Sequence, residues 1–157
     1  MNEESRSSIF KGEGRILIVP LISHIAGFLV DSVNVQVIDD CEDYVNIGNA
    51  LLKTKEIIEN SPVSKETPKE RDEHAVWKTH SKCKSRIAFW RKNYHAVFKF
   101  MENGEYDIYS TIKIKGGGEG GCIKEIILPP ESTPEELGKA VAEVLEAAEE
   151  YYKENRI

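Results

Sequence analysis

Apolar residues recur at spacings of three and four over the last part of the chain, and this period predicts an amphipathic helix that begins at Pro134. Thr133 is placed to cap its first turn, and Glu136 is placed to accept a bond from the Thr133 amide. The apolar positions are Leu137, Val141, Val144, Leu145, Ala148 and Tyr151. Glutamates occupy most of the other positions, so one face of this helix is apolar and the other is strongly acidic.

The same strand-and-helix design occurs 90 residues earlier in the chain. There the apolar run Val35–Asp39 precedes a second predicted helix, Tyr44–Glu59, with Asp43 as its N-cap. Three identical pairs carry the repeat: Gly48 and Gly138, Ala50 and Ala140, and Glu56 and Glu146. We expect the small residues to let each helix lie close to a sheet.

Short runs of β-branched and aromatic residues between turn residues predict strands in both halves. In the second half, Val97–Glu102 and Glu105–Ile114 flank Asn103-Gly104, which is typical of a two-residue hairpin turn, and Cys122–Leu128 follows. The first half predicts strands at Ser8–Lys11, Arg15–Pro20, Gly27–Ser32 and Asn34–Ile38. The expected fold class is α+β, an antiparallel sheet of short strands packed with amphipathic helices.

The length of 157 residues fits one domain spanning residues 1–157. We expect two strand-strand-helix halves, 1–60 and 94–157, separated by an insert at 61–93. Within this insert, the Pro- and Ser-rich stretch Ser61–Lys69 predicts a loop, and the pattern of Glu70–Asn93 predicts a basic amphipathic helix or two short ones.

The net charge of −6 and the pI near 5.3 disfavour a protein that coats nucleic-acid phosphates. The charge is distributed unevenly, because residues 1–60 hold 5 basic and 10 acidic side chains, the insert holds 9 and 4, and residues 94–157 hold 7 and 13. Two acidic halves therefore flank a basic insert. This pattern favours a basic protein as the partner.

No apolar run is long enough for a membrane helix, since Ile16–Val30 is interrupted by Pro20, Ser23 and His24. The polar first residues lack the features of a secretory signal, so we expect a cytoplasmic protein with no membrane partner. Cys41, Cys83 and Cys122 form no CxxC pair, which favours reduced thiols.

Catalytic and cofactor motifs are weak. The tract Gly116–Gly121 precedes a strand pattern instead of a helix, so we interpret it as a loop and not as a phosphate cradle. The spacing of His74, His80 and Cys83 matches no standard zinc site, and we expect no metal, no cofactor and no enzymatic activity. The alternative is a small hydrolase or transferase that uses His95 or His80 with a carboxylate. A self-associating scaffold is a third hypothesis.

The predicted hairpin is apolar or aromatic on both faces. A two-residue turn places Val97, Met101, Tyr106, Ile108 and Ile112 on one face and Phe98, Phe100, Tyr109 and Thr111 on the other. The second face is either covered by the basic helix that carries Trp77 and Trp90, or is a binding surface. For the second case, the predicted partner-binding residues are Phe98, Phe100, Glu105, Asp107 and Tyr109.

Several segments resemble the immunity proteins of contact-dependent growth inhibition (CDI) systems. They are Trp77–Arg86 followed by Phe89-Trp90, and Pro134–Ala140, in order with the strand Ile16–Pro20 and the Asp-ended run Val35–Asp39. The helix beginning at Tyr44 departs from this pattern, because Tyr44-Val45-Asn46 stands where the second copy has Pro-Glu-Glu.

The resemblance implies a small cytoplasmic protein that binds the C-terminal toxin domain of its cognate CDI effector, commonly a nuclease, as a 1:1 heterodimer. Such a protein blocks the toxin without chemistry of its own and has no direct contact with nucleic acid. In some members of the family the toxin offers a β-hairpin that extends the sheet of the immunity protein. The acidic net charge agrees with a basic nuclease partner, because opposite charges speed encounter.

Overall fold

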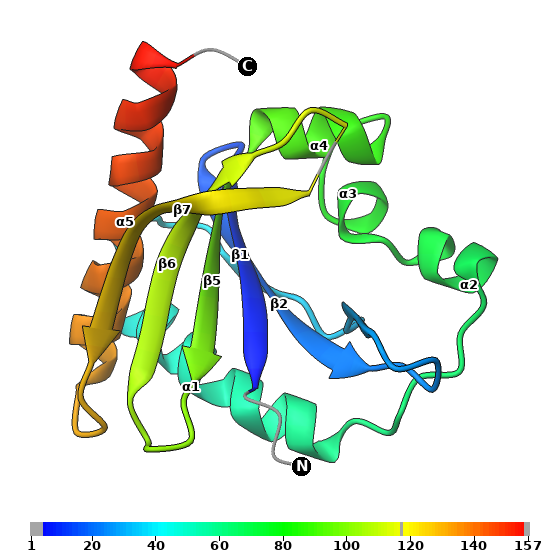
Figure 1. Ribbon diagram of the computed structural model, residues 1–157, viewed down its shortest axis with the longest axis horizontal. Coiled ribbons are helices and arrows are strands. Elements are labelled where there is room, and N and C mark those ends of the chain that lie inside the picture. The colour runs from blue at the N-terminus through cyan, green and yellow to red at the C-terminus, as the bar shows by residue number, and fades with distance from the viewer. Residues whose placement is uncertain (1–4, 117, 156–157) are drawn as a thin grey trace.

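The fold is α+β, with an antiparallel sheet of seven strands and helices packed on both of its faces (Figure 1). The computed structural model describes residues 5–116 and 118–155. The strands are β1 (Arg6–Gly12), β2 (Arg15–Ser23), β3 (Leu29–Asp31), β4 (Gln36–Ile38), β5 (Tyr94–Phe100), β6 (Tyr106–Lys113) and β7 (Glu119–Leu128). The helices are α1 (Tyr44–Asn60), α2 (Pro68–Glu73), α3 (Val76–Thr79), α4 (Arg86–Lys92) and α5 (Pro134–Glu154). The predicted fold class is therefore confirmed.

The strand order is β3-β2-β1-β5-β6-β7, and β4 also pairs with β2. β3 pairs with Leu21–Ser23 of β2, and β4 pairs with Ile16–Ile18 of β2. The two short strands therefore lie one after the other beside β2. The two edge strands of the sheet thus differ in length, since β7 has 10 residues and β3 has 3.

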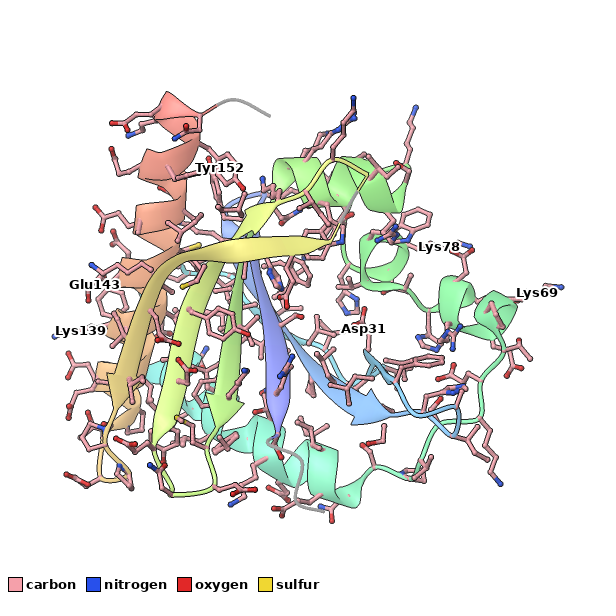
Figure 2. The ribbon with its side chains drawn as sticks, in the orientation of Figure 1. Asp31, Lys69, Lys78, Lys139, Glu143 and Tyr152 are labelled. Atoms are coloured by element: carbon pink, nitrogen blue, oxygen red, sulfur yellow. The ribbon has the colours of Figure 1, made fainter. Side chains whose placement is uncertain are left out.

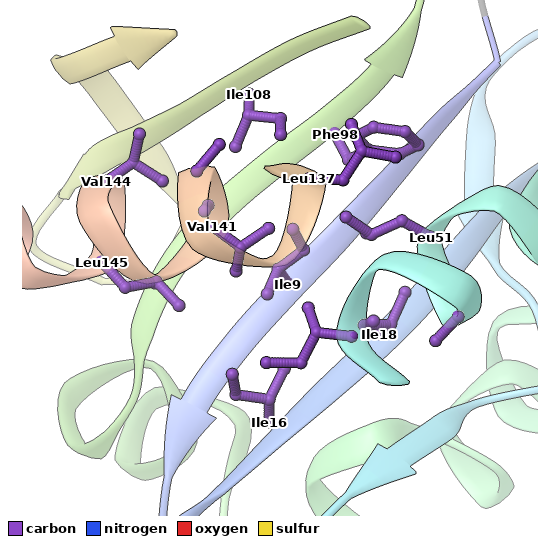
Figure 3. Close-up of a cluster of buried hydrophobic side chains, with 14 of the residues drawn as sticks. Ile9, Ile16, Ile18, Leu51, Phe98, Ile108, Leu137, Val141, Val144 and Leu145 are labelled. Atoms are coloured by element: carbon purple, nitrogen blue, oxygen red, sulfur yellow. The ribbon is translucent and has the colours of Figure 1, made fainter. Parts of the chain in front are cut away.

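The two long helices α1 and α5 cover one face of the sheet and enclose the larger core (Figure 3). Alternate residues of the central strands point into this core, where Ile9, Ile18 and Phe98 are fully buried beneath Leu51 and Val141. The capping box predicted for α5 is present, since the Thr133 side chain accepts a hydrogen bond from the Glu136 amide at 3.2 Å. The repeat thus predicts both helices that cover this face.

The two glycines that the repeat aligns, Gly48 and Gly138, lie at the contact between these two helices. A Cβ added at Gly48 would lie 1.8 Å from the Pro134 carbonyl oxygen, and one added at Gly138 would lie 2.0 Å from the Tyr44 carbonyl oxygen. Each glycine therefore faces the first residue of the other helix. The expectation that these glycines bring the helices close to the sheet is wrong, because the backbone that touches them belongs to the partner helix.

The insert covers part of the opposite face. It contains three short helices, α2, α3 and α4, where the sequence predicted one or two, and the first begins at Pro68 with its own capping box from Thr67. A second buried cluster forms where α3 and α4 meet β1 and β2, and it consists of Phe10, Leu17, Val19, Val76, Cys83 and Phe89. In Figure 1 these helices lie above and beside β1 and β2, whereas no helix lies in front of the lower parts of β5 and β6.

The hairpin of β5 and β6 has a register one residue away from the predicted one. Phe98 pairs with Ile108 and Val97 pairs with Tyr109. The cause is the connection: the Met101 amide donates to the Glu105 carbonyl and the Gly104 amide donates to the Met101 carbonyl, each at 2.9 Å. Only Gly104 of the turn has a positive φ, 88°, which is the pattern of a three-residue connection ending in a glycine bulge.

Because side chains alternate between the two faces of a sheet, a shift of one residue moves every side chain of β6 to the other face relative to those of β5. The prediction that Phe98 and Phe100 share a face with Tyr109 is therefore wrong, because both phenylalanines point toward α1 and α5 while Tyr109 points to the opposite face.

Candidate functional site

The predicted partner-binding residues separate onto two sides of the sheet. Phe98 is fully buried in the core, and Phe100 packs partly buried against it, with the Lys55 ammonium 5.7 Å from its ring centre. These two side chains stabilise the packing of the sheet on α1. Phe98 is thus not accessible to a partner in this structure.

The other three predicted residues lie on or beside the face that is opposite α1 and α5. Tyr109 is half-buried there with the Lys99 ammonium 5.3 Å from its ring centre, and burial raises the pKa of its hydroxyl, with nearby Glu119 acting in the same direction. Asp107 is only 8% exposed, and Glu105 lies in the connection, where its amide donates to the Asn103 side chain at 3.0 Å. The face available at this hairpin is therefore a polar one built around a single aromatic ring.

A hollow of about 500 Å³ lies at the other end of the sheet, between β3 and the short helices α2 and α3. Residues Phe28 to Asp31 line it on the side of the strand, which we call its floor. Its other lining residues include Arg71 of α2, His74 at the end of α2, Trp77 of α3 and Arg86 of α4. Figure 2 shows Asp31 beside β2, on the side where α3 with Lys78 and α2 with Lys69 lie. The hollow thus runs along the end strand of the sheet.

Exposed hydrophobic side chains lie in this hollow and in the hairpin that contributes to it, and Phe28 and Leu29 are among its lining residues. Ile25 is 64% exposed, Phe28 46% and Leu29 40%, all in or beside the β2–β3 hairpin, and Val63 of the neighbouring segment is 54% exposed. The Ile25 amide donates to the Ser64 carbonyl at 2.9 Å, so Val63 lies next to the hairpin. Exposed apolar groups that gather beside a concave surface are typical of a protein–protein contact.

The segment that carries α2 is attached to this hairpin by hydrogen bonds centred on Glu66. The His24 ring bonds the Glu66 carbonyl oxygen at 2.9 Å, and the His74 ring bonds the Glu66 carboxylate. No residue of α2 is buried. The outer wall of the hollow is therefore held by polar contacts and not by a packed core.

Sequence reasoning missed this hollow, although the chain carries a signal for it. Ile25, Phe28 and Leu29 surround the turn glycine Gly27, whose φ is 91°, and turns are usually polar. That apolar turn indicates a contact surface, but only the tertiary structure brings α2 and α3 beside it.

His95, the first histidine of the enzymatic alternative, is 1% exposed and lies among aromatic rings. Its Nδ1 lies 2.7 Å from the Thr111 hydroxyl and 3.8 Å from the Glu119 carboxylate, because the first part of β7 crosses in front of the sheet (Figure 1). Burial lowers the pKa of His95 to about 3. His80, the second candidate, bonds the Thr79 hydroxyl at 2.7 Å, and burial lowers its pKa as well. Neither histidine lines the hollow beside β3.

The described residues contain no group of three or more histidine, cysteine or acidic side chains placed to hold a metal ion. Among the same residues, no helix has the length and apolar character needed to cross a membrane.

Comparisons with known proteins find likeness in structure but not in sequence. No family model matches the chain, and no curated protein matches it. A Neisseria meningitidis protein of unknown function, NMB0488, has a similar structure with a TM-score of 0.66 and 17% identity over 93% of this chain and 97% of that one. A chain of the CdiA-CT/CdiI toxin and immunity complex from Yersinia pseudotuberculosis has a TM-score of 0.62 and 14% identity over 93% and 98% of the two chains. At these identities the likeness shows a shared fold.

Proposed function

We propose that this protein is an immunity protein, which binds the C-terminal toxin domain of a cognate CDI effector and neutralises it by stoichiometric binding. The observation that carries the proposal is the shared fold with a chain of a toxin and immunity complex, which spans nearly the whole length of both chains. The resemblance of the Trp77–Arg86 and Pro134–Ala140 segments to CDI immunity proteins supports the same function.

The free edge of β3 is the surface that best fits a strand from the toxin. The His24 amide donates to the Phe28 carbonyl and the Ser32 amide donates to the Pro20 carbonyl, both at 2.8 Å, so even-numbered residues of this segment bond β2. The backbone groups of Leu29 and Asp31 therefore point away from β2. A partner strand can add to such an edge through main-chain hydrogen bonds, while the hollow receives its side chains.

The first prediction concerns binding and neutralisation. The toxin domain encoded directly upstream, mixed with this protein, should form a 1:1 complex with a dissociation constant well below micromolar, and its toxic activity should fall in proportion to the complex formed. Calorimetry and a nuclease assay measure the two quantities. Absence of binding at micromolar concentration would contradict the proposed function, as would binding that leaves the toxin fully active.

The second prediction distinguishes the β3 edge from the face around Tyr109. Leu29→Pro removes an amide that points away from β2, so it should weaken the toxin complex at least about tenfold, as expected when an edge strand loses a donor, with little loss of stability. Val33→Pro, in the connection after β3, is the matched control and should bind normally. Tyr109→Ala tests the other face. If Tyr109→Ala weakens the complex and Leu29→Pro does not, the toxin binds the hairpin face and the β3 assignment is wrong.

A further inference from the structure

Asp31 lies in the floor of the hollow, and the register of β3 determines which face of the sheet its side chain is on. Leu29 and Asp31 are two residues apart and pair with Ser23 and Leu21, so their side chains share the face on which the buried Val19 contacts the α3 and α4 cluster. Both side chains line the hollow. A strand added to β3 would therefore place two of its own side chains, also two residues apart, directly beside Leu29 and Asp31.

Most other charged groups of the hollow have partners. The Asp72 carboxylate lies 3.8 Å from the Lys78 ammonium, the Arg71 guanidinium lies 5.1 Å from the Phe28 ring centre, and His74 bonds Glu66. Asp31 accepts no hydrogen bond and forms no ion pair among the described residues. Burial raises the pKa of the Asp31 carboxyl, and the nearby His74 acts in the opposite direction. Asp31 lies at the hollow without a hydrogen bond or an ion pair to any residue that the structure describes, so a cation that a partner brings beside it would form a new charge-assisted contact.

We propose that Asp31 is a specificity-determining residue, which selects partner strands that place a lysine or arginine beside it and an apolar residue beside Leu29. This inference rests on the proposed function and on strand addition at β3. In an antiparallel strand the two positions read basic-x-apolar along the partner chain, because the residue opposite Asp31 comes before the residue opposite Leu29. Trp77 and Phe28 offer apolar and aromatic surface to the stem of the basic side chain.

Cyclised β-hairpin peptides test this inference without the toxin, so its outcome is separate from that of the neutralisation assay. Three peptides carry Lys-Thr-Val, norleucine-Thr-Val or Glu-Thr-Val on the outer strand. Titration of the full-length, isotope-labelled protein is followed through the amide resonances of Leu29 and Asp31. The Lys peptide should shift these resonances and should bind at least about tenfold more tightly than the Glu peptide, since a single close charge pair near a protein surface can have this size.

Asp31→Asn should remove the preference for lysine, whereas Asp39→Asn, the matched control at an exposed carboxylate after β4 that does not line the hollow, should retain it. Thermal denaturation of both variants verifies that they fold. The inference is overturned if the Glu peptide binds as tightly as the Lys peptide, in which case Arg86 and Arg71 dominate the hollow. It is also overturned if the preference survives in Asp31→Asn, or if no peptide shifts the β3 amides.

Discussion

Gly138→Ala should lower the free energy of unfolding by about 3 kcal/mol, which for a domain of this size lowers the melting temperature by about 10 °C. In an exposed helix the same change stabilises by about 1 kcal/mol, so the sign of the effect is itself informative. Here the new methyl group would lie 2.0 Å from the Tyr44 carbonyl oxygen. Since a backbone carbonyl cannot rotate away as a side chain does, α1 and α5 must separate. Denaturant titration measures the loss.

The same contact can be tested from the other helix, with a double variant and with a control. Gly48→Ala should destabilise by a similar amount, because its methyl group meets the Pro134 carbonyl of the other helix, and the double variant should lose less than the sum of the two. Helix separation that relieves one contact also relieves the other. Asn49→Ala, at the exposed neighbouring position, is the control and should leave stability nearly unchanged. Unchanged stability in both glycine variants would contradict the close helix crossing.

The second large effect is a loss of stability in acid that depends on His95. The pKa of this histidine is about 3 in the folded protein and about 6.5 in the unfolded chain, so between these values only the unfolded chain binds the proton. Stability contributed by the neutral ring is present above pH 6.5 and is lost as the pH falls. From pH 7 to pH 5 this loss is about 2 kcal/mol, and by pH 4 it is about 3 kcal/mol.

His95→Gln should remove this component, so its stability should fall less between pH 7 and pH 4 than that of the unmodified protein. Thr111→Val is the matched control, because it removes the 2.7 Å contact of the ring but leaves its burial, which causes the shift. That variant should keep the acid dependence. Equal pH dependence in His95→Gln and the unmodified protein would show that another group is responsible.

The hairpin at Asn103-Gly104 marks the limit of local signals. Its existence and the identity of its strands follow from the turn dipeptide and the flanking β-branched and aromatic residues. Its register depends on the turn. A two-residue turn needs a positive φ at both Asn103 and Gly104, whereas the observed connection has a positive φ at Gly104 alone. Which of the two forms depends on which face of the hairpin packs under α1 and α5. A one-residue difference therefore moved Phe98 from the predicted binding surface to the centre of the core.

The hollow beside β3 marks a second limit. The sequence indicates a short strand near Asp31 and a basic insert with tryptophans, but no local pattern relates Asp31 to Trp77 or Arg86. The three meet because β3 is the end strand of the sheet and because α3 packs on Val19 and Leu17 of β2. Candidate binding residues separated by tens of positions are brought together only by that packing.

Local patterns were enough to predict the α+β class, the two long helices with their caps and most of the strands, because capping, periodicity and turn chemistry act between residues a few positions apart. Packing between distant segments sets the hairpin register, the contact of Gly48 and Gly138 across two helices, the burial of His95 and the hollow along β3. Each of these depends on which surfaces pack against each other, and the free energy of this packing comes from contacts between side chains that lie far apart in the chain.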